Sequence, residues 1–337
     1  MPEYFQSYFS FLTFHKISVF LQLFQFIPQK LITNYMSHQN ASVKSILFAL
    51  LANFGIAITK TVAAVITGSG SMLAESIHSY ADCGNQGLLF LGLKKSKKAP
   101  EVEHPLGYGK EIYFWSFIVA LMLFSMGGLF SIYEGIHKLS SHEGLKSPMI
   151  AVVVLSVSMV LEAASLYGCL TQINKVKHNM SLWQWVKNTR QSELVIVLGE
   201  DLAALFGLTF ALIAVVLAMI TGNPVWDAVG SIGIGALLIF VSFFLAIKVK
   251  GLLVGQSADK DTRDEILKFL QNRPEIEEVL NVITLQMGET IMVSIKARMV
   301  KVDTAENLVK NINACEAALK TSNKAIQWVF FEPDVEK

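Results

Sequence analysis

Residues 74–87, AESIHSYADCGNQG, carry ionisable side chains within an otherwise apolar part of the chain. His78 and Asp82 are four residues apart, so a helix would place both on one face. An acidic pair, Glu200 and Asp201, lies in a second apolar stretch. Two helices that each offer such groups can build a four-coordinate site of nitrogen and oxygen ligands for Zn²⁺ or another divalent transition ion. The spacing therefore predicts a metal site between these two stretches.

The composition indicates the environment of that site. Of the 337 residues, 53% are hydrophobic and only 16% are charged, which is too apolar for a soluble protein of this length. We therefore expect an integral membrane protein with a soluble part. The net charge of +1 leaves no basic surplus for binding nucleic acid. Cys83, Cys169 and Cys315 are far apart and form no CxxC pair, so neither a disulfide framework nor a thiolate cluster is indicated.

The apolar residues gather in windows of about 20, the length that a helix needs to cross the hydrocarbon core. Six windows predict six spans, at 43–66, 71–93, 112–137, 148–170, 195–220 and 226–249. Basic residues concentrate in alternate connections and after the last window: at 94–98 (KKSKK), at Lys175, Lys177, Lys187 and Arg190, and at Lys248 and Lys250. By the positive-inside rule, both termini are expected in the cytoplasm.

The two ends of the chain differ from this middle part. We expect an N-terminal extension at 1–41, a transmembrane domain at 42–250 and a cytoplasmic domain at 251–337. The apolar run of the extension is interrupted by polar residues, so it is interpreted either as an interfacial amphipathic helix or as an upstream mis-start before Met36. The last part predicts a helix over 261–279, strands over 279–288 and 290–300, a helix over 305–322 and a strand over 325–334, which is an α+β domain.

Charged residues inside membrane spans are functional by default, because each must pair or line a wet cavity. For Lys60 we favour a structural role, in which it neutralises a neighbouring carboxylate. Glu134 and Asp227 lie near span ends, where a helix cap or interfacial solvation explains them as well as a function does. Further ionisable residues inside the spans are Glu75, His78, Asp82, Glu162, Glu200 and Asp201.

Three segments together resemble one known family. AESIHSYADCGNQ is similar to the second transmembrane helix of the cation diffusion facilitator family, with its HxxxD motif. HPLGYGKEIYFWSF (104–117) resembles the segment that leads into the third helix, and GEDLAALFG (199–207) resembles the fifth-helix element DxxxxxG. The resemblance runs from about residue 42 to 335, in the order of the family, and is closest to the zinc-transporter-like branch that has Glu-Asp in helix five.

The resemblance implies a six-helix transmembrane bundle with a C-terminal ferredoxin-like cytoplasmic domain. It implies a homodimeric antiporter, not an enzyme, that exports a divalent metal ion from the cytoplasm against protons and holds no permanent cofactor. The cell (inner) membrane is the expected location. His78, Asp82 and Asp201 are carried over as metal ligands. Packing glycines that would permit helix movement are Gly127, Gly128, Gly207, Gly230, Gly233 and Gly235.

This sequence departs from the pattern of many zinc members at Val197, where they have a histidine four residues before the helix-five aspartate. Glu200 is the favoured fourth ligand, with Asn53, Asn85 or water as weaker candidates. A site with one nitrogen and three oxygens admits Mn²⁺, Fe²⁺ or Co²⁺ beside the expected Zn²⁺.

Outside the spans, no histidine occurs from 251 to 337, so no regulatory zinc site is expected there. His104 precedes Pro105 and is expected to structure its loop rather than to bind metal. A membrane metal sensor or scaffold that does not transport is the alternative function.

Overall fold

The computed structural model describes residues 39–141, 145–177 and 180–336, with side chains from residue 53 onward. Residues 1–52 and 53–337 form two units, and all contacts below lie within the second. Most of the N-terminal extension predicted for 1–41 lies outside the described residues.

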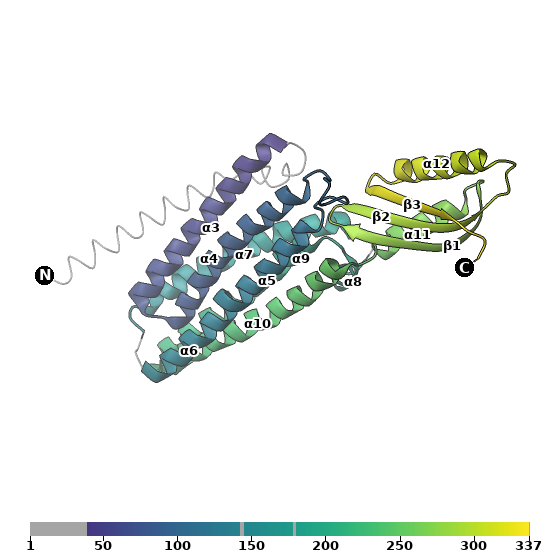
Figure 1. The fold of residues 1–337 in the computed structure, drawn as a ribbon. Helices are drawn as coiled ribbons and strands as arrows, with labels where there is room; N and C mark the ends of the chain where they lie inside the picture. The colour runs from purple at the N-terminus through teal and green to yellow at the C-terminus, as the bar shows by residue number, and fades with distance from the viewer. Residues whose placement is uncertain (1–38, 142–144, 178–179, 337) are drawn as a thin grey trace. The chain divides into compact units, whose positions relative to one another are not determined.

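Helices occupy the places of all six predicted spans (Figure 1). They are α3 (Gln39–Thr67), α4 (Gly70–Ser96), α5 (Glu111–Met122) with η1 (Leu123–Leu129) and α6 (Phe130–Ser141), α7 (Pro148–Val176), α9 (Ser192–Thr221) and α10 (Val225–Val254). The short helix α8 (Leu182–Asn188) lies between α7 and α9 and was not predicted.

Four of the described helical stretches are long and apolar enough to cross a membrane on their own: Glu111–Ser140, Pro148–Val176, Ser192–Thr221 and Val225–Val254. Helix α4 is less apolar because Glu75, His78 and Asp82 lie in it. In α3 the described side chains begin at residue 53, and the stretch Asn53–Thr67 is apolar. The fold class of an α-helical membrane protein is confirmed.

Close helix packing uses five of the six predicted glycines. A Cβ atom on Gly230 would lie 2.3 Å from the Cβ of Ala214, and one on Gly235 would lie 2.7 Å from the carbonyl oxygen of Gly128. Gly127 and Gly207 are similarly crowded. Gly233 was predicted in the same role, but no atom lies within 4 Å of the position that its Cβ would take. It faces away from the neighbouring helices, so that part of the prediction is wrong.

Helix α4 begins at a cap built from two distant parts of the chain. The Ser69 hydroxyl accepts a hydrogen bond from the amide of Met72, while Asp227 of α10 accepts from the Ser69 hydroxyl at 2.6 Å and from the Gly70 amide at 2.6 Å. A carboxylate at this position satisfies the free N–H groups of the first turn and complements the helix dipole. Asp227 therefore has the capping role that the sequence left open.

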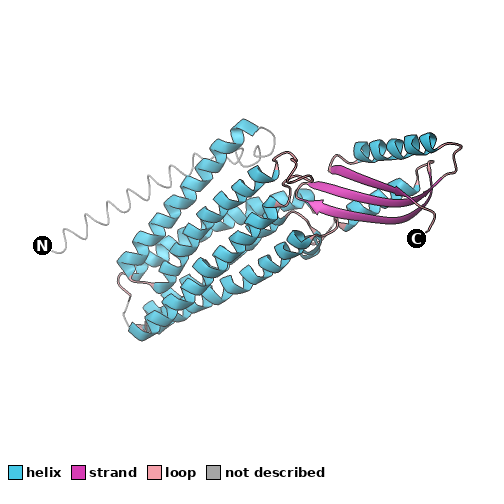
Figure 2. Cartoon of the chain, in the orientation of Figure 1, coloured by secondary structure: helices cyan, strands magenta, loops and turns pink. Residues whose placement is uncertain are grey.

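The C-terminal part has its own hydrophobic core and contains all the described strands (Figure 2). Its elements are α11 (Lys260–Gln271), β1 (Ile276–Met287), β2 (Thr290–Met299), α12 (Ala305–Ser322) and β3 (Ile326–Pro333). Strand β2 is central, antiparallel to β1 and parallel to β3. Every second residue of β2 is buried, which is the pattern of a strand with one face on a core.

Two details of this domain follow from local chemistry. Gly288, with φ of 68°, opens the two-residue turn between β1 and β2, where a residue with a side chain would be strained. The helix predicted over 261–279 ends instead at Gln271, and residues from Ile276 belong to β1. Pro274 explains this error, because proline cannot continue a helix and disfavours helical backbone at the residue before it. The α+β fold and the order of its elements are confirmed.

Candidate metal site

One face of α4 carries the polar residues that were selected from the sequence. Glu75, His78, Asp82 and Asn85 follow one another at intervals of three or four residues, so the helix aligns them. Glu75, His78 and Asn85 are each at most 1% exposed. Their opposite wall is α9, since a Cβ on Gly207 would lie 2.5 Å from Glu75 Oε1.

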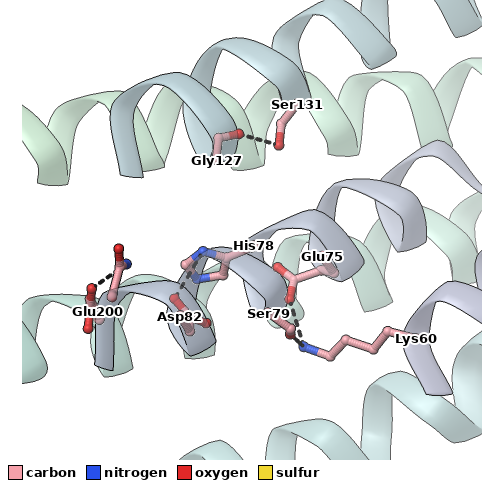
Figure 3. Close-up of polar contacts among 9 residues, drawn as sticks. Lys60, Glu75, His78, Ser79, Asp82, Gly127, Ser131 and Glu200 are labelled. Carbon is pink, nitrogen blue, oxygen red and sulfur yellow. Dashed lines mark hydrogen bonds and ion pairs between the residues drawn. The ribbon is translucent and has the colours of Figure 1, made fainter. Parts of the chain in front are cut away.

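His78 and Asp82 point toward each other along this face (Figure 3). His78 Nδ1 lies 3.6 Å from Asp82 Oδ1, which is too far for a hydrogen bond. Within the described residues, both ring nitrogens of His78 and Oδ1 of Asp82 have no hydrogen-bond partner. The structure therefore brings together the two predicted ligands of α4 and leaves their lone pairs unused.

The two predicted ligands of α9 are held by other side chains. Asn85 Nδ2 donates a hydrogen bond to Glu200 Oε1 at 2.6 Å. The hydroxyl of Ser165, on α7, donates to Asp201 Oδ1 at 3.2 Å. Oδ2 of Asp201 has no hydrogen-bond partner among the described residues. Asn85 thus holds Glu200, whereas the sequence suggested it only as a weaker candidate ligand.

The four predicted ligands are near one another but not gathered around one point. In the part of the chain that the structure describes, no group of three His, Cys, Asp or Glu side chains is close enough to hold a metal ion. The reason lies in the hydrogen bonds just described, which turn Glu200 toward Asn85 and Asp201 toward Ser165. These residues could bind an ion together only after their side chains change rotamer.

A buried ion pair lies beside the site. Lys60 Nζ of α3 lies 3.3 Å from Glu75 Oε2 and donates to the Ser79 hydroxyl at 2.8 Å (Figure 3). Lys60 is 1% exposed and Glu75 is 0% exposed. Neither charge could be buried alone at a tolerable cost, so each compensates the other. The neutralisation of a neighbouring carboxylate that was expected of Lys60 is present in the structure.

Sequence reasoning missed Ser79 and Ser165, which hold Lys60 and Asp201. A serine in a membrane helix gives no signal of its own, because it commonly bonds to the carbonyl of the preceding turn.

His104, in the loop before α5, stacks on Tyr108 with ring centroids 4.3 Å apart and lies 3.6 Å from Glu101. It makes these contacts within its own loop, in line with its expected structural role. The hydroxyl of Tyr108 donates to Glu101, and this bond, with Lys98, lowers the pKa of the Glu101 carboxyl.

The fold and the site together define a membrane protein whose helices enclose a partly unsatisfied cluster of carboxylates and one imidazole. The model of the cation efflux transmembrane domain matches residues 46–254. The chain therefore belongs to the cation efflux family, also called the cation diffusion facilitator family, as the motifs of α4 and α9 predicted.

Curated relatives include transporters from several organisms. The human proton-coupled zinc antiporter SLC30A9, mitochondrial, is 34% identical over 250 residues, which cover 73% of this chain and 44% of the relative. Metal tolerance protein C4 of Arabidopsis thaliana is 32% identical over 267 residues, which cover 74% of this chain and 58% of the relative. Magnetosome protein MamB of Magnetospirillum gryphiswaldense is 25% identical over 255 residues, covering 75% and 80%. The chain thus matches less than half of the length of the antiporter.

Proposed function

We propose that the chain is a divalent metal cation carrier that exports Zn²⁺ from the cytoplasm in exchange for protons. The observation that carries the proposal is the polar face between α4 and α9, where His78, Asp82 and Asp201 keep buried nitrogen and oxygen atoms without hydrogen-bond partners. A buried acceptor without a partner costs about 1–3 kcal/mol. A divalent cation would satisfy several such atoms at once. Membership of the cation efflux family and the zinc antiporter among the relatives support the same substrate.

Proton exchange follows from the chemistry of the ligands. Carboxylates and imidazole bind a metal ion only when they are deprotonated, so protons and the ion compete for the same atoms. A proton can replace the ion on Asp82, Glu200 or Asp201, because three negative charges in a membrane bundle need compensation when the ion leaves. No covalent chemistry is needed, and the protein acts as a carrier and not as an enzyme.

The hydrogen bonds of Glu200 and Asp201 lower the affinity of the site for the ion. The ion must displace Asn85 from Glu200 and Ser165 from Asp201, and part of its binding energy is lost in doing so. A carrier needs such moderate affinity in order to release its substrate, whereas a sensor or scaffold would gain from a fully preformed site. We further propose a homodimer in the cell membrane with both termini in the cytoplasm, as the basic connections and the family suggest.

The test is metal flux in vesicles that contain the purified protein, with an imposed pH gradient and a panel of Zn²⁺, Mn²⁺, Fe²⁺ and Co²⁺. We expect pH-driven Zn²⁺ flux in the parent and none in Asp82→Ala, because the substitution removes one of the two proposed ligands on α4. Glu134→Gln, a change in a glutamate of α6, is the control and should transport normally. Normal flux through a correctly inserted Asp82→Ala protein would show that the site is elsewhere. Zinc binding by a parent that shows no flux would favour the sensor.

A further inference from the structure

Helix α7 forms a third wall beside the site. Ser158, Glu162, Ser165 and Cys169 lie at intervals of three or four residues on one face of α7. One contact fixes this face against α9, because Ser165 donates its hydrogen bond to Asp201. Glu162 is one turn from Ser165 on this same face.

Glu162 lies on the face of α7 that meets α9, because Ser165, one turn further along the same face, donates a hydrogen bond to Asp201. At longer range the Glu162 carboxylate is close enough to Asp82, Glu200 and Asp201 for electrostatic repulsion. Among the described residues Glu162 forms no hydrogen bond or ion pair, and its side chain is half-buried. A carboxylate so placed adds repulsion to an acidic cluster and gains nothing from the protein itself.

An acidic cluster alone does not define a site, but this one surrounds buried atoms that need a ligand. His78 is 1% exposed and neither ring nitrogen has a hydrogen-bond partner in the described structure. Asp201 is 8% exposed and its Oδ2 is likewise unpaired. A bound divalent cation would use these lone pairs and relieve the repulsion from Glu162 at the same time.

The predicted site also lacks one ligand atom on α9, and the Glu162 carboxylate could supply it from α7. On α9 the position one turn before Asp201 is Val197, which offers no ligand atom. The imidazole of His78 is therefore the one nitrogen ligand among the predicted residues, and the remaining ligands must be oxygens. Helix α7, which packs on α9, is the neighbour that brings another carboxylate to this side.

We propose that Glu162 is a further ion-binding residue of this site, and that its carboxylate binds the divalent cation from a third helix, α7. The inference rests on the proposed function, because it requires that the site between α4 and α9 binds a divalent cation. It assigns the ion an oxygen-rich set with one imidazole, spread over three helices. Oxygen ligands favour harder ions, so Glu162 widens the range of bound ions from Zn²⁺ toward Mn²⁺.

The test measures binding to the full-length protein in detergent, without reference to transport. Zn²⁺ and Mn²⁺ affinities are determined by calorimetry for the parent, Glu162→Gln and His78→Ala, with Glu134→Gln as the matched control. Glu134 is also a half-buried glutamate of a membrane helix, and it is in no described contact with the site. Bound Co²⁺ gives a second readout, since its visible absorption depends on the number and type of its ligands.

We expect Glu162→Gln to weaken Zn²⁺ binding about tenfold or more, the range seen when groups around a metal are removed. Mn²⁺ affinity should fall further than Zn²⁺ affinity, and the Co²⁺ spectrum should change, while Glu134→Gln matches the parent. Should Glu162→Gln fail to elute as a folded protein, Glu162→Asp retains the charge on a shorter side chain and should show the same changes at smaller size.

The possible failures are distinguishable. A parent that binds no divalent ion, or a His78→Ala protein that binds like the parent, would overturn the site and with it the proposed function. If His78→Ala loses binding but Glu162→Gln keeps the affinities and the Co²⁺ spectrum of Glu134→Gln, only the role of Glu162 is refuted.

Discussion

The contact between Gly230 of α10 and Ala214 of α9 allows a quantitative test of the bundle. A Cβ on Gly230 would lie 2.3 Å from the Cβ of Ala214, whereas carbon atoms in contact stay about 3.5–4.0 Å apart. Neither Cβ can rotate away, so Gly230→Ala must move the two helices apart. Overpacking of this kind costs about 1–3 kcal/mol. Replacing glycine by alanine inside a helix stabilises the helix by about 1 kcal/mol through its higher helix propensity.

Gly233→Ala isolates the cost of the overlap. It lies on the same helix, and no atom is within 4 Å of its Cβ position, so this variant gains the helix propensity and no clash. The free energy of unfolding of Gly230→Ala should therefore lie about 1–3 kcal/mol below that of Gly233→Ala. Equilibrium unfolding in mixed micelles, followed by helical circular dichroism, measures the difference.

A compensating substitution makes the test stricter. In Ala214→Gly/Gly230→Ala the methyl group moves from α9 to α10, so the contact is restored and the two propensity changes cancel. The free energy of unfolding of the double variant should lie within about 0.5 kcal/mol of that of the parent. Effects of independent substitutions add to within this amount. If its destabilisation equals the sum of the two single changes, α9 and α10 do not meet at these residues and the packing described here is wrong.

Three further outcomes are expected. Asp227→Ala should lower the free energy of unfolding by about 1–3 kcal/mol, because the Ser69 hydroxyl and the Gly70 amide lose a buried acceptor. Asp227→Asn should lower it less. Equal stability of the parent and both variants would contradict the cap. Residues 255–337 should bind no Zn²⁺ tightly in calorimetry, because they contain no histidine, and a stoichiometric sub-micromolar site would disprove this. Cys315 is 1% exposed and burial raises the pKa of its thiol, so iodoacetamide should label it only after unfolding; labelling of the native protein at the rate of a free thiol would exclude this burial.

Most of the helices could be predicted from the sequence, because long apolar windows separated by polar connections leave few alternatives. Helix α8 was missed because it is only seven residues long, although Ser181 and Gln184 form a capping box that indicates a helix start. The π-helical segment η1 gives no such signal. Its Gly127 and Gly128 lie close to α10, and this long-range packing is not visible in local propensity.

The candidate site was predictable only in part. The shared face of His78 and Asp82 follows from helix periodicity, since both belong to one element. The pairing of Asn85 with Glu200, and of Ser165 with Asp201, depends on the rotation and depth of three helices against one another. No spacing within a single helix specifies these, so the hydrogen bonds that now hold the α9 carboxylates could be found only in the structure.

The polar groups along α4 differ in how far the protein satisfies them. At the start of α4, Asp227 satisfies Ser69 and Gly70. One turn further, Lys60 compensates Glu75, and near residue 85 the amide of Asn85 meets Glu200.

Between these pairs lie His78 and Asp82. Both ring nitrogens of His78 and Oδ1 of Asp82 have no partner in the described structure, and one side-chain oxygen each of Glu75 and Asn85, on either side, also has none. Unpaired polar atoms are costly in a bundle that excludes water. The unpaired atoms therefore extend along α4 from Glu75 to Asn85, and the divalent cation proposed above would satisfy those of His78 and Asp82.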